Sequence, residues 1–125
     1  MEVKSKIPPV HGFLEIKLDE NIIDYLWKII DIAKTKNINF NDQLIGNISQ
    51  SLLLNDLDCF FYNSVCVPLA KYYRQINPIG IDPVSQNALL RNKTRLVLDR
   101  FWVNYQYKNE FNPYHDHPGV YSFAI

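Results

Sequence analysis

The chain has 125 residues, of which 47% are hydrophobic and 14% aromatic, and its 13 Lys and Arg balance its 13 Asp and Glu. This length and composition fit one domain with its own hydrophobic core and exclude a disordered chain, while the balanced charge gives no field that recruits nucleic acid or an anionic membrane. No apolar run approaches the ~18–20 residues of a membrane-spanning helix, and the N-terminus lacks the apolar stretch of a secretory signal. We therefore expect a soluble, cytoplasmic protein whose two cysteines are free thiols.

The first half of the chain predicts one strand and two helices. Residues 12–18 alternate at period two, which is typical of a short half-buried strand. Residues 20–36 change to helical spacing and predict a helix that begins after Asp19. Residues 37–56 are rich in turn formers and predict mostly irregular structure. A second helix is expected over roughly 56–75, capped by Asn55 or Asp56 and kinked or divided at Pro68.

The second half of the chain predicts strands. Residues 77–94 are rich in Pro, Gly and Asn and predict a loop, whereas residues 95–109 are rich in Val, Phe, Trp and Tyr and predict a long strand. A turn follows, and residues 115–125 are expected to begin another strand around a Pro-Gly break. Helices that precede strands, with no internal repeat, favour a single α+β domain over residues 1–125.

Two histidines stand two residues apart near the end of the chain. On an extended segment His115 and His117 point to the same side, and Asp116 points away. Two imidazoles presented together form half of a transition-metal site. Asp116 would be a further ligand only if the backbone bends, or it could orient an imidazole through a hydrogen bond. The alternative is a surface turn shaped by Asn112, Pro113 and Pro118, and the H-x-H spacing alone does not separate the two interpretations.

The faces of the preceding strand bear on this choice. One face carries an aromatic and aliphatic set, and the other carries a more polar set, Trp102, Asn104 and Gln106. If the helices pack on the face of Phe101, Val103, Tyr105 and Tyr107, the polar set faces away from them. In a barrel-like roll that direction is a polar cavity, which the two histidines would also enter. In an ordinary sandwich the same face looks at solvent.

The segment FWVNYQYKNEFNPYHDHPGVYSF resembles the core segment of the iron(II)/2-oxoglutarate-dependent oxygenases found in marine phages and bacteria. Their pattern reads W-x-N and then, after a spacer, N-P-x-H-x-H-x-G-x-x-S-F. The close resemblance covers about the last quarter of the chain. The positions that match are Trp102, Asn104, Gln106, Asn112, Pro113, His115, His117, Gly119, Ser122 and Phe123.

The resemblance implies a jelly-roll, or double-stranded β-helix, with helices packed on one sheet. It also implies Fe(II) held by a facial triad, with 2-oxoglutarate as co-substrate for the oxidation of a second, unidentified substrate. On this interpretation His115 is the first ligand, and His117 stands where the commonest pattern has a carboxylate, so it either completes a three-His site or is not a ligand. Asn104 and Gln106 are expected to contact 2-oxoglutarate, with Tyr105 as the rival if the strand faces are reversed.

The family's distal His and the Arg or Lys that pairs 2-oxoglutarate follow the first ligand at a distance. Here 10 residues follow His115, none of them Arg or Lys, and the remaining histidine, His11, is interpreted as a surface residue. We therefore expect the N-terminal portion of a longer protein, with an incomplete jelly-roll that is inactive alone. Its exposed terminal strand would offer an edge for pairing into homo-oligomers.

Two other functions remain open on the sequence. A non-catalytic jelly-roll used for binding or assembly, for example in a phage particle, would use the histidines structurally. A cupin-like metal enzyme would bind a metal without 2-oxoglutarate. Metal content and the response to 2-oxoglutarate distinguish the three.

Overall fold

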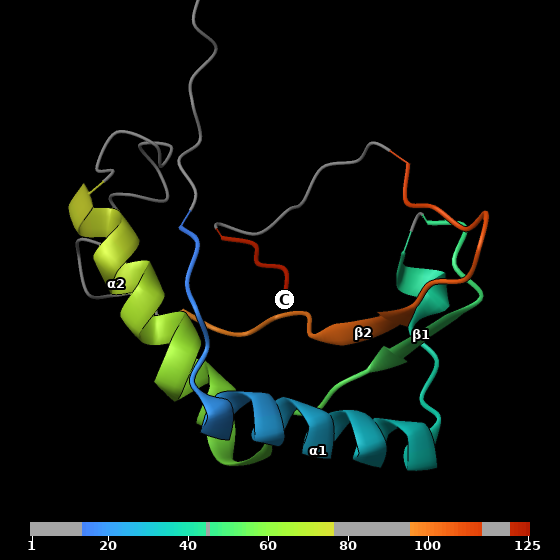
Figure 1. Cartoon of the computed structure of the whole chain (residues 1–125), viewed down its shortest axis with the longest axis horizontal. Coiled ribbons are helices and arrows are strands. Elements are labelled where there is room, and N and C mark those ends of the chain that lie inside the picture. Colours follow the sequence, from blue (N-terminus) through green and yellow to red (C-terminus); the bar gives the residue numbers. More distant parts are fainter. Residues whose placement is uncertain (1–13, 45, 77–95, 114–120) are drawn as a thin grey trace, which may run out of the picture.

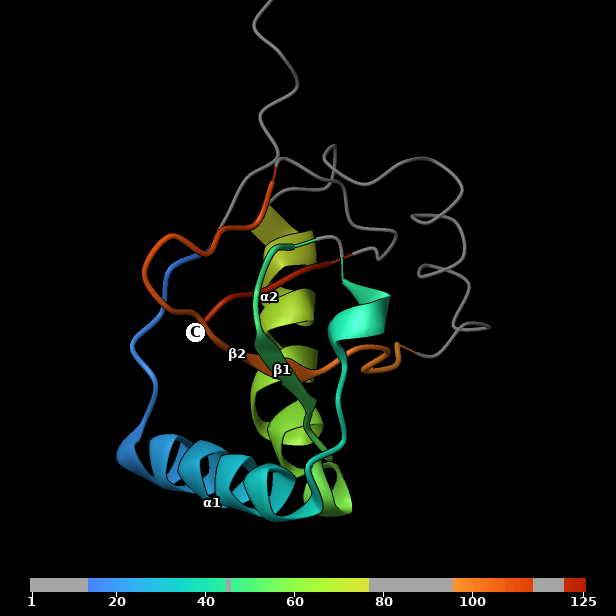
Figure 2. The same cartoon turned by 90° about the vertical axis from the view of Figure 1, so that its right-hand side faces the viewer.

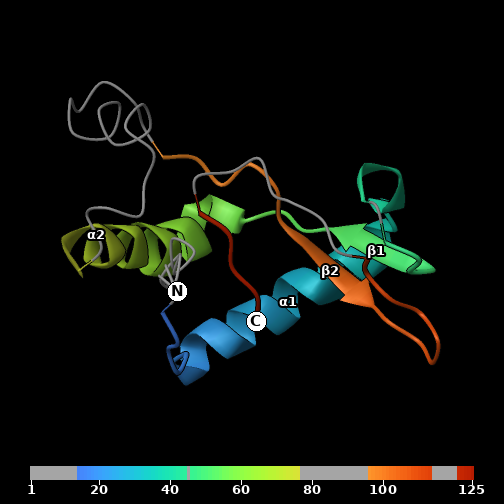
Figure 3. The same ribbon diagram turned by 90° about the horizontal axis from the view of Figure 1, so that it is seen from above.

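The computed structural model describes residues 14–44, 46–76, 96–113 and 121–125. Its main elements are two helices, α1 (Glu20–Lys36) and α2 (Val67–Ile76), and two antiparallel strands, β1 (Gln50–Leu53) and β2 (Trp102–Tyr105). Figures 1 and 2 show α1 running along the base of the molecule with α2 rising from it, and Figure 3 shows α1 passing beneath the sheet. The described residues thus mix helices with a small antiparallel sheet, as the predicted α+β class requires, but two strands do not make the predicted jelly-roll.

Helix α1 has the predicted bounds. Its buried residues recur at helical spacing and form one stripe toward the core: Ile22, Leu26, Ile29 and Ala33. The helix ends at Asn37, which adopts the left-handed conformation (φ 49°) and donates its N–H to the Ala33 carbonyl at 2.7 Å. Asp19 occupies the N-cap position, but its side chain makes no capping hydrogen bond. Neither helix in the described residues is long and apolar enough to cross a membrane.

The second helical region consists of a 3₁₀ turn (Leu57–Cys59), a π-helical stretch (Tyr62–Cys66) and α2, and it is not divided at Pro68. Pro68 is the second residue of α2 and closely follows the π-helical stretch, whose flanking residues Phe61 and Val67 both have right-handed helical backbones, so its missing N–H falls inside a continuous helical run. A change from π to α geometry, rather than a break, lies directly before the proline. The expected cap is Asp56, whose carboxylate accepts the N–H groups of Phe61 and Tyr62, each at 2.8 Å.

Strand β1 corrects the prediction that residues 37–56 are mostly irregular. It pairs with β2 in a register that sets Gln50 opposite Tyr105 and Leu53 opposite Trp102. On its other edge the Leu53 N–H donates to the Ile38 carbonyl at 3.0 Å, so β1 lies between β2 and the segment around Asn39. Both faces of β1 are covered, because Ser51 and Leu52 are each 1% exposed. A strand buried on both faces shows no alternation of polar and apolar residues, which is why the sequence concealed it.

Other predicted strands are shorter than expected or do not form. Residues 14–18 of the segment predicted as a strand form no strand; Leu18 packs against the core while Ile16 is 46% exposed. The strand predicted over 95–109 is limited to β2 within its described part, since its neighbour β1 has only four residues. Residues 121–125 do not form the predicted terminal strand, because Phe123 instead packs its ring on Phe61 and Phe101.

The core joins the helices to one face of the sheet. Phe61, 1% exposed, stacks on Phe101 with the ring centroids 5.0 Å apart. Val103 and Tyr105 pack against the same cluster, together with the buried stripe of α1. The helices therefore pack on the face of Phe101, Val103 and Tyr105, which the sequence left as one of two possibilities, whereas Tyr107, assigned to the same face, is 62% exposed. Trp102 and Asn104 consequently point away from the helices.

Candidate functional site

The predicted metal ligands His115 and His117 lie outside the described residues, as do Asp116 and His11. Of the candidate site, the structure describes the segment that precedes the histidines in the sequence, which we call the wall. This wall consists of β2, the turn after it, and the chain up to Pro113. Among the residues that the structure describes, no three His, Cys, Asp or Glu side chains gather in a way that could hold a metal ion.

Asn104 is the polar side chain that β2 presents on the face away from the helices. It is exposed, and it lies opposite Ser51 in the β1–β2 register. The buried Ser51 hydroxyl donates to Asn104 Oδ1 at 2.7 Å. Because this bond engages Oδ1 and the residue is exposed, the Nδ2 group with its two hydrogens is left as the available donor of the side chain. A side-chain amide held in this way is a suitable donor to a carboxylate.

Ser51 is itself fixed by the segment that covers this face. Its backbone N–H donates to Asn41 Oδ1 at 2.7 Å, and the neighbouring Phe40 stacks its ring on Trp102 with the centroids 5.6 Å apart. The face is therefore divided. Its Trp102 end is covered by an aromatic ring, and its Asn104 end is exposed and polar. Within β2 the exposed polar part of this face is accordingly limited to Asn104, whereas the cavity considered from the sequence would be lined by Trp102, Asn104 and Gln106.

Gln106 lies in the turn that follows β2 and is used by that turn. Its Nε2 donates to the Glu110 carbonyl at 2.7 Å, and the Glu110 carboxylate accepts the N–H groups of Tyr107 (2.9 Å) and Ser49 (3.0 Å). Beyond the turn, Phe111 pairs with Asn47 and returns the chain to the line of β1. Glu110 is thus a positioning residue that sequence reasoning missed. The sequence predicted a turn over residues 110–113, whereas the turn that Glu110 holds lies at 107–110, at the end of the predicted strand.

Tyr105, the rival to Asn104, lies on the opposite face. Its side chain packs against the core cluster, and the Lys34 ammonium of α1 sits 5.4 Å from its ring centroid. The strand faces are therefore not reversed. Of the three candidates for contact with 2-oxoglutarate, Asn104 has an available amide donor, Gln106 donates within its turn, and Tyr105 packs inward.

A second polar location lies between α1 and the start of the second helical region. An open cavity of about 380 Å³ is lined there by Tyr25, Lys28, Leu57, Asp58, Phe60, Asn63 and Ser64. The Tyr25 hydroxyl donates to Asp56 at 2.5 Å. Burial first, and then the hydrogen bond and charge of Asp56, raise the pKa of Tyr25. Since Asp56 also caps the helix, we interpret this pair as a structural clamp rather than an acid–base site.

No family model matches the chain, and no match is found among the curated proteins or the solved structures. A functional assignment therefore depends on the residues themselves and on the geometry of β1 and β2.

Proposed function

We propose that the chain is an iron(II)/2-oxoglutarate-dependent oxygenase-like protein in which His115 and His117 bind Fe(II) and Asn104 binds a carboxylate of 2-oxoglutarate. The observation that carries the proposal is the orientation of Asn104, which the Ser51 hydroxyl holds at 2.7 Å on the sheet face away from the helices. The sequence pattern around His115 supplies the metal half of the proposal.

The arrangement of the helices supports the jelly-roll part of the proposal. A jelly-roll with helices on one sheet needs a strand whose apolar side chains face the helices and whose polar side chains face the other way. β2 has this division, with Val103 and Tyr105 packed against the core and Asn104 exposed on the opposite face. In the proposed fold, β1 and β2 are neighbouring strands of the sheet that the helices cover.

The donor set is suited to Fe(II), since imidazoles and carboxylates with open positions are the ligands of non-heme iron oxygenases. When bound, the iron supplies activation of O₂ coupled to the decarboxylation of 2-oxoglutarate. The described residues contribute binding, because the Asn104 amide donates to an anionic oxygen, and orientation, because Glu110 fixes the turn between β2 and the histidines. For Gln106 to bind 2-oxoglutarate as well, its side-chain amide must first release its hydrogen bond to the Glu110 carbonyl.

Binding of Fe(II) and of 2-oxoglutarate is the first test of the proposal, because it depends directly on His115, His117 and Asn104. The experiment is an anaerobic titration with Fe(II) and 2-oxoglutarate, followed through the weak visible charge-transfer band of their chelate. We expect a band in the wild-type chain that is lost in His115→Ala. In Asn104→Ala we expect unchanged iron uptake but weaker binding of 2-oxoglutarate.

His11→Ala is the matched control, because it removes a histidine from outside the pattern. If the wild-type chain takes up no more iron than a His115→Ala/His117→Ala double variant, the oxygenase proposal is wrong. Iron uptake without any response to 2-oxoglutarate would instead favour the cupin-like alternative. Indifference to both would favour a binding or assembly module.

A further inference from the structure

We propose that the exposed flank of α1 is a dimer interface, on which a second copy of the chain docks its own α1 in the opposite direction. The flank consists of five residues spaced three, four, three and four apart along the helix: Glu20, Ile23, Trp27, Ile30 and Lys34. This is the spacing of a seam between two packed helices. The seam begins with an acid, has an apolar centre and ends with a base.

The apolar centre of this seam is unusually exposed for a helix that also packs a full core stripe. Trp27 is 59% exposed and Ile23 is 36% exposed, whereas Ile30 is partly buried and packs against the core. Tryptophan buries a large area with few rotatable bonds, and it is among the residues that dominate the energy of protein interfaces. Trp27 therefore forms the contact point.

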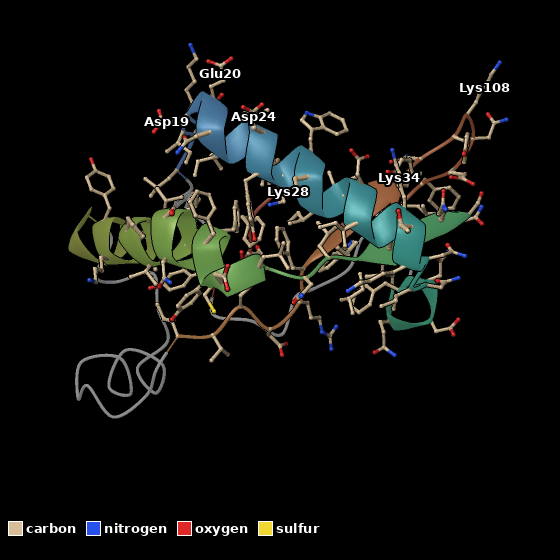
Figure 4. All side chains as sticks on the ribbon, turned by 90° about the horizontal axis from the view of Figure 1, so that it is seen from below. Asp19, Glu20, Asp24, Lys28, Lys34 and Lys108 are labelled. Carbon is tan, nitrogen blue, oxygen red and sulfur yellow. The ribbon has the colours of Figure 1, made fainter. Side chains whose placement is uncertain are left out.

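The charges select a second copy as the partner. Figure 4 shows Asp19, Glu20 and Asp24 at one end of α1 and Lys34 near the other end. Glu20 and Lys34 each lie seven residues from Trp27. A two-fold axis passing near Trp27 therefore brings Glu20 of each copy beside Lys34 of the other. The interface is self-complementary, as a two-fold interface must be, whereas parallel helices would place like charges together.

The contact is expected to be weak and sensitive to salt. Lys34, with a side chain 47% exposed, already lies 3.7 Å from Asp31 of its own helix and 5.4 Å from the ring centroid of Tyr105, so pairing with a second copy must compete with both contacts. One helix flank covers far less than the ~800 Å² per partner of a stable complex. Half-association is therefore expected at roughly 0.1 mM protein at low ionic strength, and weaker association at higher salt.

Sedimentation velocity of the 125-residue chain, from about 10 µM to about 1 mM, tests the proposal. Glu20→Lys and Lys34→Glu should each weaken self-association at least about tenfold, because the two-fold axis makes every substitution act at two ion pairs. An equimolar mixture of the two variants should associate again, because both pairs are then opposite in charge. The double variant Glu20→Lys/Lys34→Glu should dimerise like the wild type, and Trp27→Ala should remain monomeric.

Lys28→Glu is the matched control, since it makes the same charge change on α1 but lines the cavity beside Asp58. It should leave the dimer intact. A wild-type chain that stays monomeric throughout the concentration range would overturn the proposal. So would a dimer that survives Trp27→Ala, or a mixture of the two charge variants that associates no better than each alone. Far-UV circular dichroism confirms that each variant is folded, so loss of association is not confused with loss of the helix.

Discussion

Asp56 is the residue whose removal we expect to separate α1 from the second helical region. One of its carboxylate oxygens accepts the Tyr25 hydroxyl at 2.5 Å and the Phe61 N–H at 2.8 Å. The other oxygen accepts the Tyr62 N–H, also at 2.8 Å. Asp56→Ala removes all three acceptor contacts at once. The first turn of the helix then loses its cap, and the partly buried Tyr25 hydroxyl is left with the Leu57 carbonyl, at 3.3 Å, as its acceptor.

The magnitude follows from these contacts. Loss of a helix cap costs about 1–2 kcal/mol of unfolding free energy, and a hydrogen bond to a charged acceptor contributes about 1.5–3 kcal/mol. Because the Leu57 carbonyl remains near the Tyr25 hydroxyl, the lower half of the second range applies. We therefore expect Asp56→Ala to lower the unfolding free energy by about 3 kcal/mol, a large part of the ~5–15 kcal/mol that stabilises a typical domain.

Urea denaturation followed by far-UV circular dichroism measures this change. A double-mutant cycle of Asp56→Ala with Tyr25→Phe should give a coupling energy of about 1–2 kcal/mol, with the remainder due to the cap. Asp24→Ala is the control, because it removes the same charge from an exposed position of α1. If Asp56→Ala destabilises no more than Asp24→Ala, or if the coupling falls below about 0.5 kcal/mol, Asp56 is not a clamp.

Two further predictions concern the cysteines. Cys59 has a left-handed backbone (φ 54°), and so does Asp58 directly before it. Because glycine adopts this conformation without steric cost, Cys59→Gly should raise the unfolding free energy by about 0.5–1 kcal/mol. A lower urea midpoint at unchanged slope would contradict this. Burial, followed by the charge of Asp56, raises the pKa of Cys66 from 9.0 to about 11. The folded state thus holds the thiol proton more tightly, so this stabilisation is complete below pH 9 and is lost as the pH rises through 11. In Cys59→Ser, alkylation of Cys66 by iodoacetamide should keep rising about tenfold per pH unit up to that range, and a plateau near pH 9 would refute the burial.

The sequence predicted α1 to the residue because several independent signals agree there. Four buried apolar residues share one stripe, Asp19 stands at the N-cap position, and Lys34 and Lys36 lie in the last turn, where basic residues are favoured. The strands were harder to predict, because a strand needs a partner as well as a propensity. Residues 95–109 are rich in strand formers, yet β2 extends only from Trp102 to Tyr105, the length of its neighbour β1.

At the candidate site, alternation along β2 correctly placed Asn104 and Tyr105 on opposite faces, since period two is a local property of any strand. The partner of Asn104 was not predictable in the same way. Ser51 lies 53 residues earlier, in a segment without a strand signal. The use of Gln106 within its turn also depends on Glu110, whose carboxylate reaches across to Ser49 on the segment that precedes β1. Contacts between distant segments are properties of the register, which the local pattern does not encode.

The register of β1 and β2 connects the fold to the proposed site. A shift by one residue would place Leu52 or Gln50 opposite Asn104 and would turn the side chains of β1 to the wrong faces. The Ser51 hydroxyl, 1% exposed, would then lose its acceptor while buried, at a cost of about 1–3 kcal/mol. The Ser51–Asn104 bond therefore does two things at once. It penalises every other pairing of the two strands, and in the pairing that remains it leaves the amide donor of Asn104 available. If the proposed function is correct, the contact that sets the register of the sheet is also the contact that prepares it to bind a carboxylate.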